Sequence, residues 1–100
     1  MSDDITKLLT RNLSFIKDNI TDIDSVLDKL IEDEIIRLED RTRILLNKNP
    51  RLQVHAMLEI VIKKGAYNTF VEALKASGNI HIIDRLKNTD INTGKNYFLY

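Results

Sequence analysis

Apolar residues recur every three or four positions in one segment of this chain after another, which is the spacing of an amphipathic helix. Only three Gly and one Pro occur among the 100 residues, so frequent turns between short strands are not expected. A chain of this length buries one core. We therefore predict one all-α domain of six short helices, which run from Asp4 to Asn19, Thr21 to Glu32, Leu38 to Leu46, Pro50 to Gly65, Tyr67 to Gly78 and Asn79 to Leu86.

Capping signals separate these helices. The segment Thr21-Asp22-Ile23-Asp24 has the Thr-x-x-acid form of a capping box. Asn49 precedes a proline at the first helical position, where the missing N–H costs nothing. Gly65 and Gly78 predict left-handed helix stops, and Asn79 is expected to cap the last helix.

The apolar faces of the predicted helices differ in clarity. In the third helix the pattern is weakest, and we expect Leu38, Thr42 and Leu45 on its inner side. In the last helix Ile80, Ile83 and Leu86 are expected to point inward. The fourth helix has the clearest stripe, made of Val54, Met57, Leu58, Val61 and Ile62.

The helical pattern ends after Leu86. We predict a bundle over residues 1–87 and a polar tail or linker over residues 88–100, which closes on the aromatic cluster Tyr97-Phe98-Leu99-Tyr100. A peptide docking motif is the alternative interpretation of that cluster. The acidic start and the lack of a long apolar run predict neither a signal peptide nor a membrane span, so we expect a cytoplasmic protein without membrane contact.

Charge is segregated along the chain although the formal net charge is zero. Residues 22–40 carry eight acids and two bases, and residues 41–64 carry one acid and six bases. Such a dipolar surface suits oriented docking between proteins better than a general grip on a polyanion. Nucleic-acid binding by a helix-turn-helix is a weak alternative, because the acidic segment would meet phosphate.

The sequence offers little for catalysis. No Cys is present, so a cysteine nucleophile and a thiolate zinc site are excluded. His55 and Glu59 are spaced like half of a metal site but lack two further ligands, and His81 is expected to form a surface pair with Asp84. No Gly-rich phosphate loop occurs. We expect no enzyme, no metal and no cofactor.

The chain contains, in this order, the motifs Leu8-Leu9 with Arg11, Val26 to Ile31, Ala56-Met57-Leu58, Ile62 to Gly65, Phe70 to Leu74 and Ser77-Gly78-Asn79. Together these motifs resemble the caspase recruitment domain (CARD) of the death-fold superfamily. The similarity covers about Ile5 to Leu86 and is nearest to CARDs of initiator caspases and of apoptosome scaffolds of the apoptotic protease-activating-factor type. Many relatives have Gly where this chain has Glu34, and the connection around Gly65 is about two residues shorter than usual.

The resemblance implies a six-helix antiparallel Greek-key bundle and homotypic binding that assembles caspase-activating complexes in apoptosis or innate immunity. The implied partner is the CARD of an initiator caspase or of its scaffold, with head-to-tail self-assembly; a CARD-only decoy inhibitor is the alternative. In the common contact between such domains an acidic face meets a basic face. The implied acidic face consists of Asp24, Asp28, Glu32, Asp33, Glu39 and Asp40. The implied basic face consists of Lys7, Arg11, Lys48, Arg51, His55 and Lys63.

Overall fold

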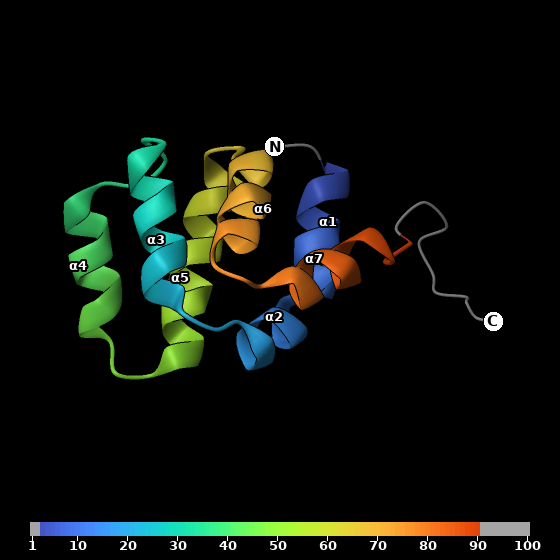
Figure 1. The fold of residues 1–100 in the computed structure, drawn as a ribbon, viewed down its shortest axis with the longest axis horizontal. Coiled ribbons are helices and arrows are strands. Elements are labelled where there is room, and N and C mark those ends of the chain that lie inside the picture. The colour runs from blue at the N-terminus through green and yellow to red at the C-terminus, as the bar shows by residue number, and fades with distance from the viewer. Residues whose placement is uncertain (1–2, 91–100) are drawn as a thin grey trace.

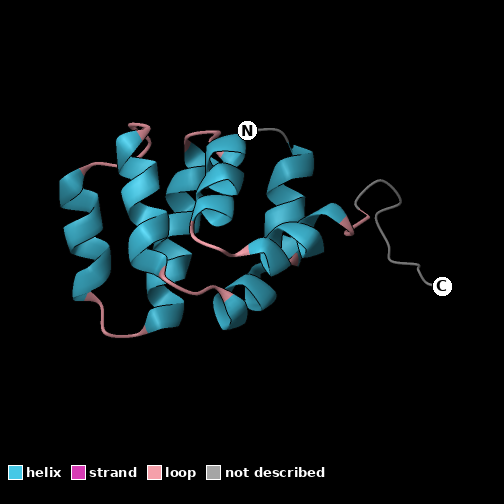
Figure 2. Cartoon of the chain, viewed as in Figure 1, coloured by secondary structure: helices cyan, strands magenta, loops and turns pink. Residues whose placement is uncertain are grey.

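The computed structural model describes residues 3–90, and this part of the chain folds into a bundle of α-helices (Figure 1). Loops connect the helices, and no strand occurs in residues 3–90 (Figure 2). The all-α prediction is confirmed. The seven helices of this range are α1 (Asp3–Arg11), α2 (Leu13–Asn19), α3 (Ile23–Glu32), α4 (Leu38–Leu46), α5 (Pro50–Lys63), α6 (Tyr67–Ala76) and α7 (Ile80–Lys87).

The first predicted helix is divided in two, so the prediction of one helix from Asp4 to Asn19 was wrong. The break lies at Asn12, which is buried. Its side-chain Nδ2 donates to the backbone oxygen of Leu8 at 2.9 Å. The backbone N–H of Asn12 donates instead to the backbone oxygen of Leu9 at 3.2 Å. The side chain thus takes the acceptor that the Asn12 N–H would use in a continuous helix.

The core lies between α3, α5 and α6, with α2 packed on α5 and α7 on α6. α4 stands at the edge of the bundle, beside α3 and α5 (Figure 1). The centre of the core is made of residues that are completely buried. The largest of them are Phe70, Leu9, Ile16, Leu27, Leu30, Met57, Leu74 and Ile82.

Two predicted inner faces were wrong in part. α4 buries Ile44, whereas Leu38 is 71% exposed. α7 buries Ile83 and Leu86 as predicted, together with Ile82, whereas Ile80 is 48% exposed. Both helices are short and peripheral, so the bundle contacts only part of their circumference and the apolar spacing does not fix the inward direction.

Several predicted caps are confirmed. The Asn49 side chain accepts from the N–H of Arg51 at 2.9 Å. Gly65 and Gly78 have φ values of 63° and 81° and follow α5 and α6. The predicted capping box was wrong by one residue, because the N-cap of α3 is Asp22, whose carboxylate accepts from the N–H of Ser25 at 3.3 Å.

The segment after α7 folds back on the break between α1 and α2. Asn12 Nδ2 donates to Thr89 Oγ1 at 3.0 Å, and Arg11 donates to the backbone oxygen of Asp90 at 3.2 Å. The aromatic cluster from Tyr97 to Tyr100 lies outside the described residues. Within the described range, every helix is too short or too polar to cross a membrane.

Candidate functional site

The acidic candidates are centred on α3. Asp24, Asp28 and Glu32 recur every fourth residue and are all exposed, so they form one ridge along the helix. The Glu32 carboxylate has no hydrogen-bond or ion-pair partner among residues 3–90. The ridge is the most concentrated negative feature that the sequence predicted, and the structure places it on the solvent side of α3.

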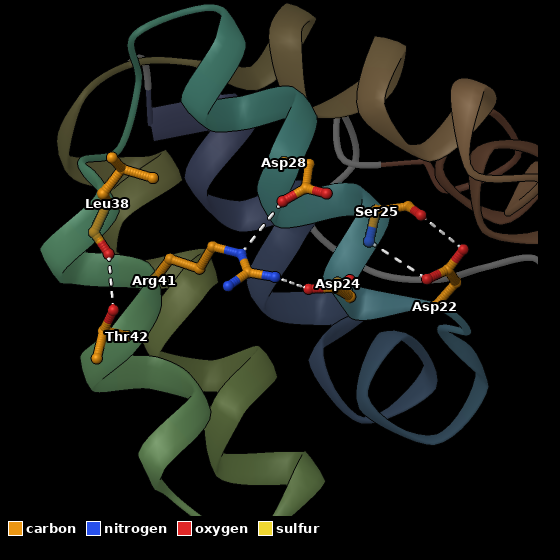
Figure 3. Close-up of polar contacts among 7 residues, drawn as sticks. All are labelled: Asp22, Asp24, Ser25, Asp28, Leu38, Arg41 and Thr42. Atoms are coloured by element: carbon orange, nitrogen blue, oxygen red, sulfur yellow. Dashed lines mark hydrogen bonds and ion pairs between the residues drawn. The ribbon is translucent and has the colours of Figure 1, made fainter.

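A cation of α4 lies against this ridge. Arg41 Nε donates to Asp28 Oδ1 at 3.1 Å, and a terminal nitrogen of the same guanidinium donates to Asp24 Oδ1 (Figure 3). α4 is therefore joined to α3 by one arginine that holds two carboxylates. Arg41 is not among the residues predicted from the sequence, because nothing in the local pattern shows that residues 13 and 17 positions apart meet.

The other acidic candidates have different surroundings. Asp33 pairs with Lys29 at 3.4 Å, about 100° around the helix from Glu32. Glu39 lies 3.7 Å from Arg37 across an exposed pair. These two carboxylates are exposed and take no part in the contact of Arg41 with Asp24 and Asp28.

Asp40 has a structural role at the start of α4. Its Oδ2 accepts from the backbone N–H of Arg37 at 3.1 Å, and its Oδ1 accepts from Arg43 at 3.0 Å. The hydrogen bond from the Arg37 backbone is the main cause that lowers the pKa of Asp40 below its usual value, and Arg43 adds to this effect. The carboxylate stays ionised at neutral pH.

The basic candidates are centred on the contact between α2 and α5. Arg51 at the start of α5 forms an ion pair with Asp18 of α2. One turn further, His55 Nδ1 lies 2.9 Å from the Nζ of Lys17. Because an ammonium only donates, Nδ1 accepts in this contact. Lys17 was not predicted from the sequence as a member of this cluster, because it lies among the polar residues of another helix.

His55 and His81 take protein partners. His55 Nε2 lies 4.0 Å from Glu59 Oε1. His81 Nε2 lies 2.8 Å from the backbone oxygen of Asn19, so it contacts α2 in place of the expected Asp84. Across residues 3–90, no three His, Asp or Glu side chains gather closely enough to hold a metal ion.

The remaining basic candidates are spread over the molecule. Lys63 is twelve residues beyond Arg51 in α5, about 18 Å along the axis. There it lines an open groove between α4 and α5 together with Arg43 and Glu59. Lys7, Arg11 and Lys48 are exposed, and Arg11 contacts the segment after α7. The structure therefore brings together Arg51, His55 and Lys17, and separates Lys63 from them.

Comparison with known proteins bears on this arrangement. Residues 6–89 match the family model described as "CARD: Caspase recruitment domain". Neither a curated protein nor a solved structure matches the chain significantly. The match covers α2 to α7 completely and most of α1, and it agrees with the all-helical bundle. Members of this family are protein-interaction domains that bind other CARDs. The chain belongs to the caspase recruitment domain family of the death fold.

Proposed function

We propose that this domain docks head to tail, with the acidic ridge of α3 on one molecule against the basic cluster of α2 and α5 on the next. The observation that carries the proposal is that the exposed acids of the ridge and the gathered basic side chains lie on different helices. The ridge contains Asp24, Asp28 and Glu32, whereas Arg51, His55 and Lys17 gather on other helices. In Figure 1, α3 lies in front and α5 behind it.

A contact between unlike surfaces has a structural consequence. A domain that offers both surfaces does not close into a two-fold dimer and adds further copies in rings or helical stacks. Each exposed ion pair contributes only about 0–1 kcal/mol. Several aligned pairs steer the encounter and fix the register, and a reversed charge adds repulsion.

We further propose that the natural partner is the CARD of an initiator caspase or of its scaffold protein. In this role the domain recruits or assembles a caspase-activating complex in the cytoplasm, in apoptosis or innate immune signalling. A decoy inhibitor would use the same two faces and block assembly. A pulldown from the source cell with the parent chain and its Glu32→Arg variant identifies the partner that binds through the ridge.

The docking contact is tested with two charge reversals. Glu32→Arg changes a ridge residue that has no partner among residues 3–90, so it breaks no internal ion pair. Arg51→Glu loses only the exposed pair with Asp18, which costs about 0–1 kcal/mol of stability. We expect each variant to be monomeric by analytical ultracentrifugation. A mixture of the two retains one intact ridge and one intact basic cluster, and should form a heterodimer that high salt dissociates.

Matched controls are Lys87→Glu and Asp84→Arg, which make the same charge changes on α7. We expect both to assemble like the parent chain. If all four variants assemble like the parent while circular dichroism shows folded protein, the two charged faces are solvated surface and the proposal fails.

A further inference from the structure

Arg41 occupies a position that a partner's cation would be expected to take. Its guanidinium contacts both Asp24 and Asp28, the first two carboxylates of the ridge. The Arg41 side chain is 29% exposed, whereas the side chains of Asp24 and Asp28 are 59% and 52% exposed. The cation is therefore the most buried member of the cluster, and the two carboxylates keep much of their surface open to solvent (Figure 3).

The charge balance of this cluster is incomplete. One guanidinium against Asp24 and Asp28 leaves a single net negative charge where these two carboxylates alone would have two. Arginine stays protonated at all accessible pH values, so this neutralisation is permanent. The other two arginines of this region do not share the task, because Arg37 pairs with Glu39 and Arg43 with Asp40.

We propose that Arg41 is an internal competitor for the partner's cation and sets the affinity of the acidic ridge. This inference rests on the proposed function, in which the ridge receives a basic side chain from another CARD. An incoming guanidinium or ammonium at Asp24 or Asp28 meets oxygens that already accept from Arg41, and it is repelled by the charge of Arg41. The domain thus holds its own ridge in a partly satisfied state, and removal of the competitor strengthens docking.

The test uses the heterodimer of the two charge-reversed chains as the probe. The Arg51→Glu chain supplies the ridge, with and without Arg41→Gln, and the Glu32→Arg chain supplies the basic cluster. We expect Arg41→Gln to lower the Kd about fivefold, chiefly through faster association, and high salt to remove most of this gain. Arg43→Gln is the matched control, since it deletes the same charge from the same helix without touching Asp24 or Asp28. We expect it to change the Kd by less than about twofold.

The possible outcomes separate this inference from the proposed function. If the Arg51→Glu chain and the Glu32→Arg chain do not form a heterodimer, the docking proposal itself fails. If the heterodimer forms and Arg41→Gln leaves its Kd unchanged or raises it, Arg41 is not a competitor. An equal gain from Arg43→Gln also overturns the inference, because the effect then comes from net charge alone.

A second variant covers loss of folding. Arg41 also ties α4 to α3, so circular dichroism must show that Arg41→Gln is folded. If it is not, Arg41→Lys carries the test, because its compact ammonium keeps the charge and lacks the planar fork that holds two carboxylates. We expect that variant to bind about twofold more tightly than the parent, and an unchanged Kd in the folded variant overturns the inference.

Discussion

Asn79 and Thr21 are joined by hydrogen bonds in both directions across 58 positions of sequence. The N–H of Thr21 donates to Asn79 Oδ1 at 2.8 Å, and Asn79 Nδ2 donates to the backbone oxygen of Thr21 at 2.9 Å. Asn79 is completely buried. The amide side chain therefore acts as a backbone segment would, and it fastens the loop between α2 and α3 to the turn between α6 and α7.

We expect Asn79→Ala to destabilise the domain by about 2 kcal/mol or more, because it leaves the N–H and C=O of Thr21 without their partner. The measurement is the free energy of unfolding from urea denaturation. Asn79→Asp is the informative comparison, since it keeps the acceptor and loses the donor to Thr21. Unfolding free energies within about 0.5 kcal/mol of the parent value would contradict the role assigned to this side chain.

The same pair marks a limit of prediction from sequence. Thr21 and Asn79 each stand just before a helix, where local patterns predict an N-cap. In the structure Asp22 caps α3, and the Asn79 side chain forms no cap hydrogen bond to α7. Each side chain has found its partner in the other, and a pattern that spans four residues contains no information on a contact across 58 positions.

Glu34 adopts the left-handed backbone conformation and is therefore a site for a stabilising substitution. Glu34 has a φ of 63° in the turn after α3, where the N–H of Ile35 donates back to the oxygen of Leu30 at 2.8 Å. A side chain is strained in this region by about 1–2 kcal/mol, which exceeds the backbone entropy that glycine loses. We expect Glu34→Gly to raise the unfolding free energy by about 0.5–1 kcal/mol.

Asp22→Gly is the control for Glu34→Gly. Asp22 also has a positive φ, 54°, but its carboxylate accepts from both the N–H and the hydroxyl of Ser25. Relief of strain and loss of the cap oppose each other there. We therefore expect no gain in stability from Asp22→Gly, and an equal gain in both variants would show that the cap contributes nothing.

The core of α5 is the next test. Leu58 is buried, and we expect Leu58→Ala to cost about 2–5 kcal/mol through lost burial and the cavity that remains. This is a large share of the about 5–15 kcal/mol that stabilises a typical domain. Leu52→Ala changes a half-exposed leucine of the same helix, and should cost less than about 1 kcal/mol. Similar melting temperatures for the two variants would contradict the orientation of α5.

How well sequence predicted each helix depends on how much of it is buried. In α5 four of the five predicted stripe residues are fully buried and Ile62 is half-buried. α4 buries only Ile44, because little of its surface faces the bundle. The apolar spacing in its sequence therefore could not identify the inner side of this helix.

For the charged faces, the sequence identified the ridge of α3 because its acids share one helix. It could not identify Arg41 or Lys17, whose partners lie on other helices. The individual residues of the docking faces stay predictions until the charge reversals are measured.

The last prediction concerns pH and the start of α4. The pKa of Asp40 is lowered from 3.8, mainly by the backbone N–H of Arg37. A carboxyl group whose pKa is lower in the folded state stabilises the fold fully at pH values above its unfolded-state pKa. This stabilisation is lost as the pH falls through the folded-state pKa.

Asp40→Asn keeps an oxygen that accepts from Arg37 and removes the charge. We expect the parent to be more stable than Asp40→Asn at pH 7, and the difference to shrink below pH 3.8. Urea denaturation of both proteins between neutral and acidic pH measures this difference, with Glu39→Gln as the control because Glu39 is an exposed neighbour that does not cap the helix. If the difference in unfolding free energy between the parent and Asp40→Asn stays the same in acid, the charge of Asp40 does not account for it. The amide of Asp40→Asn would then be a poor acceptor for the N–H of Arg37.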